Sequence, residues 1–169
     1  MSTSLGELSA SPAVSVILPV LNEEPHLAES VMAILAQDYT GIFEVILALG
    51  PSQARTNEIA NALAARDNRV KLVANPTGKT AAGLNLAIAA SQSSVIVRVD
   101  GHAKIPINYL SLAIEILRET GAVNVGGVMA AEGISKFEKA VARAMRSPLG
   151  VGASRFHTGG ESGEVDTVY

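Results

Sequence analysis

The sequence contains no cysteine, which excludes disulfide bonds and zinc sites with cysteine ligands and is typical of a reducing compartment. Its formal net charge is -3, so the basic surface expected of a nucleic-acid-binding protein is missing. No apolar run reaches the roughly 18 residues that a membrane-spanning helix needs. Residues 1–12, "MSTSLGELSASP", lack the basic and apolar parts of a signal peptide, and we expect a flexible tail there. These absences indicate a cytoplasmic protein that binds no nucleic acid.

Several common nucleotide and metal motifs are missing as well. The "GKT" at 78–80 is not a P-loop, because Val73 stands where that motif needs its first glycine. No GxGxxG follows an apolar run, and "GVG" at 150–152 lacks the third glycine. No His-Glu-x-x-His zinc helix is present. P-loop nucleotide hydrolases and Rossmann-type dehydrogenases are therefore excluded.

The main pattern in the sequence is a set of short apolar runs. The chain has 169 residues, 48% of them hydrophobic, which is enough for one domain with a real core. The runs are "VSVILPV" (14–20), "FEVILAL" (43–49), "VKLVA" (70–74), "VIVRV" (95–99) and "VNVGGVM" (123–129). Most are continuous rather than alternating, which is typical of parallel strands that are covered on both faces.

Helical patterns separate these runs. The apolar stripes are Leu27/Val31/Ile34/Leu35, Ile59/Leu63, Leu84/Ile88 and Leu110/Ile114/Leu117, and Phe137/Val141/Met145 mark a later amphipathic helix. Alternating strands and helices predict an α/β fold with a mostly parallel central sheet and helices on both faces.

Ligands of such sheets bind beyond the carboxyl ends of the strands. The segments that follow the apolar runs are therefore where binding residues are expected. After the fourth run comes "DGHA", in which Asp100 and His102 are two residues apart and can face one ion. A carboxylate with an imidazole suits Mn²⁺ or Mg²⁺ bridging phosphates. The alternative is that Asp100 caps the next segment and Gly101 makes a turn. The residues alone leave both interpretations open.

Three stretches together resemble family 2 glycosyltransferases of the GT-A type: "VSVILPVLNEE" (14–24), "GKTAAGLNLAIAAS" (78–91) and "VIVRVDGHA" (95–103). The "RVDGHA" form is most similar to the succinoglycan type, which makes bacterial exopolysaccharide. The likeness runs from about Val14 to Tyr169. It implies a GT-A fold, a nucleotide-sugar donor, a saccharide or lipid-linked acceptor and a divalent metal, Mn²⁺ or Mg²⁺.

The resemblance also assigns roles to residues. Those that would bind the donor are Pro19, Leu21, Asn22, Glu23, Lys79, Asn85, Arg98 and Asp100. The metal ligands would be Asp100 and His102, with the histidine replacing the second aspartate of the family's Asp-x-Asp motif.

Each of these roles has a plainer alternative. Glu23 and Glu24 would place favourable charge in the first turn of a helix, with Asn22 or Glu24 as its cap. Lys79 would be an exposed loop lysine, and Asn85 would bond a neighbouring loop.

The sequence departs from the family at two places. The second strand usually ends in an aspartate that holds a uracil base, but here Ala48 and Leu49 occupy that stretch, and Gln53 or Arg55 are the candidate substitutes. A catalytic base is not identified. The late carboxylates Glu161, Glu164 and Asp166 are interpreted as a solvated loop. His157 is either a third metal ligand or a loop residue, and the loop is the interpretation we favour.

The prediction is therefore an inverting, metal-dependent glycosyltransferase of exopolysaccharide or cell-surface synthesis, in the cytoplasm or peripherally at the inner face of the membrane. We expect a donor-binding domain at 13–129 and the start of an acceptor-side segment at 130–169, with the protein continuing beyond Tyr169. A donor-binding fragment without turnover, or a nucleotidyltransferase-like enzyme of sugar nucleotides, is the alternative.

Overall fold

The computed structural model describes residues 8–53, 55–128, 133, 135–145, 147 and 163–165. The chain divides into two compact units, Met1–Arg118 and Glu119–Tyr169. The expected division at residue 129 stays a prediction. His157, Glu161 and Asp166 lie outside the described residues, whereas Glu164 is described and exposed.

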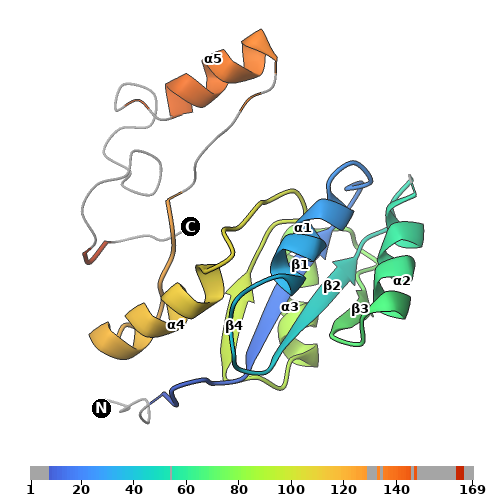
Figure 1. The fold of residues 1–169 in the computed structure, drawn as a ribbon. Coiled ribbons are helices and arrows are strands. Elements are labelled where there is room, and N and C mark those ends of the chain that lie inside the picture. The colour runs from blue at the N-terminus through green and yellow to red at the C-terminus, as the bar shows by residue number, and fades with distance from the viewer. Residues whose placement is uncertain are drawn as a thin grey trace. The chain divides into compact units, whose positions relative to one another are not determined.

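The first unit is built on a parallel sheet (Figure 1). Its strands are β1 (Val14–Val20), β2 (Phe43–Leu49), β3 (Val70–Ala74) and β4 (Val95–Arg98). Their order is β3-β2-β1-β4, and every neighbouring pair is parallel. The predicted parallel sheet is confirmed, and its first four apolar runs are its four strands.

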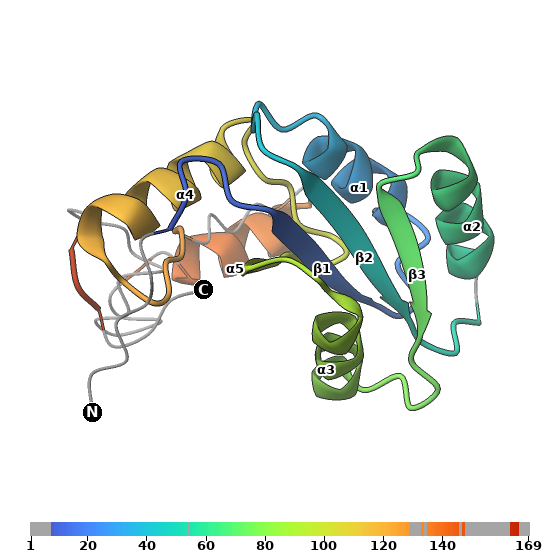
Figure 2. The ribbon, with the colours of Figure 1, turned by 90° about the horizontal axis from the view of Figure 1, so that it is seen from below.

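Helices cover both faces of this sheet, as predicted. They are α1 (Leu27–Leu35), α2 (Thr56–Arg66), α3 (Thr80–Ala90) and α4 (Tyr109–Thr120). In Figure 2, α3 lies on one face, and α1 and α2 lie on the other. The larger core forms on the α1 face, where fully buried side chains of β1 and β2 meet Leu27, Ile34 and Leu110. The smaller core is formed against α3.

Helix α3 packs through small residues, which corrects one predicted stripe. Gly83 and Ala87 are its buried positions, whereas Ile88 is 48% exposed. A Cβ at Gly83 would lie 2.8 Å from Asn75 Nδ2 and 3.4 Å from the Ala48 side chain. The close approach to the sheet therefore depends on the missing side chain, which apolar periodicity does not reveal.

Two further expectations about elements were wrong. The run at 123–129 forms no strand over its described residues 123–128, because a strand needs a neighbour to pair with and Gly126-Gly127 weakens extended structure. Helix α1 starts at Leu27 rather than at the acidic pair, so Glu23 and Glu24 precede it. Asn22 has φ +57°, and Pro25 disfavours helical geometry at the residue before it.

The second unit contains the predicted amphipathic helix, α5 (Lys136–Met145). Its Phe137 is 78% exposed, while Ala142 is buried. Within the described residues, no helix of the chain is both long enough and apolar enough to cross a bilayer.

Candidate functional site

The strand order places a switch point between β1 and β4. Chain connections run outward from β1 through β2 to β3 and then return to the other side of β1, where β4 pairs. In open parallel sheets, ligands bind at such a reversal, outside the carboxyl ends of the two strands. The segments at this place are Leu21–His26 after β1 and Val99–Pro106 after β4, which include most of the predicted site residues.

Pro19 marks where the two strands separate. The β1–β4 ladder ends at Ile17↔Arg98, and the Val99 amide still donates to the Ile17 carbonyl over 3.1 Å. Pro19 follows on the same side of β1 and has no N–H to donate, so it stands where β4 no longer offers a partner. Sequence interpretation placed this half-buried proline in the nucleotide pocket, and the fold places it at the edge of the switch point.

Glu23 and His102 meet across this separation. His102 Nδ1 lies 3.0 Å from Glu23 Oε1, although the two residues are 79 positions apart in the sequence. The Glu23 side chain is 19% exposed and the imidazole 61% exposed. A Cβ added to Gly101 would come within 2.9 Å of Glu23 Cγ, so this glycine lets the two loops approach.

The turn after β4 is anchored to helix α1. Ser30, which is buried in α1, donates its hydroxyl hydrogen to the carbonyl of Ala103 at 2.8 Å and lies 3.4 Å from that of Asp100. The Ala103 amide also donates to the Asp100 carbonyl, which closes the turn. The turn interpretation of "DGHA" is therefore correct locally, and it does not compete with a site, because the turn is what presents Asp100 and His102.

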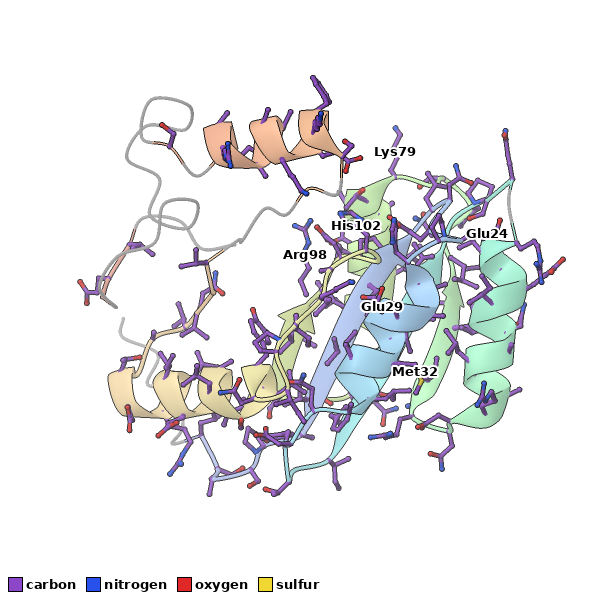
Figure 3. The ribbon with its side chains drawn as sticks, turned by 45° about the horizontal axis from the view of Figure 1, so that its top comes forward. Glu24, Glu29, Met32, Lys79, Arg98 and His102 are labelled. Atoms are coloured by element: carbon purple, nitrogen blue, oxygen red, sulfur yellow. The ribbon has the colours of Figure 1, made fainter. Side chains whose placement is uncertain are left out.

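Arg98 and Asp100 form the second charged pair of the site. Arg98 donates from Nε and Nη2 to Asp100 Oδ1 at 3.1 and 3.0 Å. The guanidinium is 53% exposed, and the carboxylate is 19% exposed. Figure 3 shows Arg98, His102 and Lys79 at the same edge of the molecule, with Glu24 nearer the start of α2.

Asn22 ties the β1–α1 loop to the β2–α2 loop. Its backbone amide donates to Ser52 Oγ at 3.1 Å, and its Oδ1 accepts from the Gln53 amide at 3.0 Å. Glu24 adds a further hydrogen bond between the two loops, because its Oε2 accepts from the Arg55 amide at 3.1 Å, just before α2. Asn22 and Glu24 therefore form hydrogen bonds with the β2–α2 loop and with the residue just before α2. Neither of them caps α1.

Leu21 supplies an apolar surface beside these loops. A Cβ at Gly50 would lie 2.9 Å from Leu21 Cδ1 and 3.2 Å from the Gly78 Cα. Gly78 has φ +64°, a conformation that favours glycine. Leu21 is 41% exposed, so it presents carbon atoms to solvent at the carboxyl edge of the sheet.

Lys79 and Asn85 belong to the α3 side of the site. Lys79 is the exposed N-cap residue of α3, and its backbone carbonyl accepts from the buried Asn75 side chain at 3.1 Å. Asn85 lies exposed in the middle of the helix. The loop before α3 is held by Thr77, which accepts from the Lys79 amide and donates to Asn75 Oδ1.

The structure therefore pairs Glu23 with His102 and Arg98 with Asp100 at the same end of the sheet, and it places Asn85 in neither pair. Sequence interpretation missed the anchoring roles of Ser30 and Ser52. Neither stands in a motif, and a serine inside an apolar helical stripe is the only signal that Ser30 offers. Among the described residues, no three His, Asp or Glu side chains converge closely enough to hold a metal by themselves.

A parallel sheet with helices on both faces and charged groups at its switch point defines an α/β protein. The chain matches Glycosyl transferase family 2 over residues 15–164, and it belongs to that family. It is 35% identical over 159 residues to "Succinoglycan biosynthesis protein ExoA" of Rhizobium meliloti (strain 1021), covering 92% of this chain and 48% of that protein. The chain thus spans about half the length of this curated relative.

Solved structures agree with the family. One is the mannosyltransferase PcManGT from Pyrobaculum calidifontis in complex with GDP-Man and Mn²⁺, with TM-score 0.60, 26% identity, and coverage of 80% of this chain and 40% of that one. Another is S. aureus TarS 1-349, with TM-score 0.64, 20% identity, and coverage of 73% and 37%. The fold is that of GT-A glycosyltransferases, as predicted.

Proposed function

We propose that this chain holds the nucleotide-sugar donor of an inverting glycosyltransferase, which moves the sugar to a saccharide or lipid-linked acceptor in exopolysaccharide or cell-surface synthesis. The observation that carries the proposal is the meeting of Glu23 with His102, beside Asp100, at the switch point of the sheet. It is supported by the 35% identity to a succinoglycan biosynthesis protein and by the GDP-Man and Mn²⁺ complex of PcManGT.

The side chains after β4 offer ligand atoms that suit a divalent metal ion. Asp100 offers a carboxylate and His102 an imidazole from one short turn, a combination that Mn²⁺ accepts better than Mg²⁺ does. Asp100 and His102 would hold such an ion, with phosphate oxygens of the donor and water as its further ligands. When bound, the ion neutralises charge that develops on the diphosphate leaving group.

The chain's own residues bind and orient the donor. Arg98 and Lys79 are exposed cations at this edge, and both would attract the diphosphate. Leu21 offers an apolar surface against which a base or ribose would pack. The hydrogen bonds of Asn22 with Ser52 and Gln53 hold the β1–α1 and β2–α2 loops together, which would keep that surface in place before the donor binds.

The donor base would be recognised without an aspartate at the end of β2. Ala48 and Leu49 carry no polar side chain, and Arg55, one candidate substitute, donates its Nε to Glu58 at 3.2 Å. Gln53 is an exposed polar side chain of the same loop, and no hydrogen bond with another described residue occupies that side chain, so it is the substitute that we favour. We therefore leave the donor among UDP-, GDP- and dTDP-sugars for experiment to decide.

Residues 130–169 are proposed to begin the acceptor side. No carboxylate in the described part of the chain matches the family's catalytic base, and the chain spans about half of its curated relative. We propose a location in the cytoplasm or peripherally at the inner face of the membrane, where a lipid-linked acceptor would be met.

Calorimetric titration tests this proposal. UDP-, GDP- and dTDP-sugars are titrated into the chain with and without MnCl₂, and one of them should bind more tightly with the metal. His102→Ala should remove most of the manganese effect and leave metal-free binding, whereas Asp100→Ala should weaken both. No binding of any nucleotide sugar would overturn the donor function, and an unchanged manganese effect in His102→Ala would remove histidine from the metal site.

A further inference from the structure

The contact between Glu23 and His102 has a defined geometry. The imidazole faces the carboxylate with Nδ1, at 3.0 Å from Oε1, so its other nitrogen, Nε2, points away from Glu23. An ionised carboxylate can only accept hydrogen bonds. A neutral imidazole carries one proton, and this contact is a hydrogen bond only when that proton is on Nδ1.

Resting on the proposed function, we propose that Glu23 is a positioning residue: it holds the His102 ring with the proton on Nδ1, so that Nε2 presents its lone pair to the metal of the donor complex. Histidines that bind metals commonly donate their second N–H to a carboxylate or carbonyl, which fixes the tautomer and the ring orientation. Glu23 then acts through His102 and does not contact the nucleotide, unlike the role that the sequence resemblance implied.

Glu23 is itself held in place for this task. Its backbone carbonyl accepts from the amides of His26 and Leu27, which begin α1. Its Cγ packs against the backbone of buried Gly101, immediately before His102. With the side chain 19% exposed, the carboxylate has little freedom to turn toward solvent. The loop that carries Glu23 is thus tied to the start of α1, and the turn that carries His102 is tied to the middle of α1 through Ser30.

The competing role for Glu23 is that of a third metal ligand. Glu23, Asp100 and His102 do not converge as a metal-binding group in the described chain, which favours positioning over ligation. Asp100 is separately engaged by the two Arg98 donors, so Glu23 is the carboxylate that faces the His102 ring.

Nuclear magnetic resonance of the imidazole nitrogens tests the proposal on the metal-free chain at mildly alkaline pH. We expect ¹⁵N shifts of His102 with the proton on Nδ1 and a bare Nε2. Adding MnCl₂ alone should broaden the His102 ring signals at lower concentration than those of His26, which serves as an internal reference. A wild-type ring with its proton on Nε2 would overturn the proposal without any mutant.

Three variants separate positioning from ligation. Glu23→Gln keeps an acceptor oxygen, so it should retain the Nδ1–H tautomer and a manganese affinity within a few-fold of wild type. Glu23→Ala should lose the tautomer preference and weaken manganese binding by about 10–100-fold. Glu29→Ala removes a carboxylate that pairs with Lys104 instead, and it should change neither measurement.

The outcomes are distinct. If Glu23→Gln keeps the tautomer but loses manganese as Glu23→Ala does, the charge of Glu23 acts on the metal directly and positioning is wrong. If Glu23→Ala retains both, the contact has no role. If the tautomer and manganese results hold but no nucleotide sugar binds, the proposed function fails while this inference stands.

Discussion

Polar side chains gather at both ends of the sheet. The two clusters differ in how far their polar groups are buried and paired within the protein. At the amino end, Ser91 donates to Ser15 at 2.6 Å, and Ser15 donates to Glu44 at 2.5 Å. Lys71 adds an ion pair to Glu44 Oε2. Ser15 is fully buried, and the Glu44 side chain is 14% exposed. The protein therefore satisfies this cluster internally.

At the carboxyl end, the groups are paired but remain open to water. His102 and Arg98 are more than half exposed, and each pairs with a carboxylate that is 19% exposed. Half-open charged pairs of this kind contribute little to stability, whereas they can exchange partners with an arriving ligand. The comparison teaches that one end of the sheet pairs its polar groups within the protein, whereas the other end leaves its charged pairs accessible to the ligand that we propose.

The largest effect expected is that of Asp100→Ala on binding. Removing this carboxylate should lower manganese-dependent affinity for the preferred nucleotide sugar by more than about 100-fold, since even the outer partners of metal ligands cost about 10–100-fold. Its ion pair with Arg98 is half-exposed, so the free energy of unfolding should change little. Calorimetry and urea unfolding measure the two quantities. If Asp100→Ala bound the nucleotide sugar as wild type does but had a lower free energy of unfolding, Asp100 would belong to the stabilising residues and the contrast between the two ends of the sheet would be wrong.

Glu44→Ala should show the opposite pattern. It removes the acceptor of Ser15 and the ion-pair partner of Lys71, which should lower the free energy of unfolding by about 2 kcal/mol. Nucleotide and manganese affinity should stay within experimental error, because the cluster lies at the other end of the strands. Urea denaturation with matched calorimetry checks both. A loss of affinity without a loss of stability would contradict the structural role.

Gly101→Ala sharpens the comparison at the site itself. The new Cβ would come within 2.9 Å of Glu23 Cγ, so the Glu23 side chain must move away and release His102. We expect manganese affinity to fall by about 10-fold. Gly121→Ala is the control, because φ +66° strains an alanine there while no atom lies within 4 Å, so it should cost stability and leave affinity unchanged. Unchanged affinity in Gly101→Ala would show that the two loops are not coupled.

The smallest effect expected is in the pH dependence of stability. Burial raises the pKa of Glu44, but hydrogen bonds from Lys71 and Ser15 together with the charge of Lys71 outweigh it, so the pKa lies below the ordinary value of a glutamate. A carboxyl group with a lowered folded pKa stabilises the protein above its unfolded pKa, and this contribution is lost as pH falls through the folded value. Wild type should therefore lose more stability than Glu44→Gln between about pH 6 and pH 3. Parallel curves from urea unfolding would contradict this.

Much of the fold was decided by the sequence itself. The hydrophobicity of neighbouring residues and its periodicity are local properties, and they predicted four strands whose bounds the structure reproduces to within a residue. The same holds for the parallel sheet with helices on both faces. The "DGHA" turn at the end of β4 was readable too, because turn chemistry and strand ends are encoded by neighbouring residues.

Only the tertiary structure decided how the site is assembled. The pairing of Glu23 with His102 depends on β4 joining the outer side of β1, and no local pattern encodes a contact between residues 79 positions apart. The roles of Ser30, Gly83 and Gly101 are equally hidden, because each depends on what the folded chain brings against them. Residue type predicted which groups can do chemistry, whereas strand order and close packing determined which of them meet.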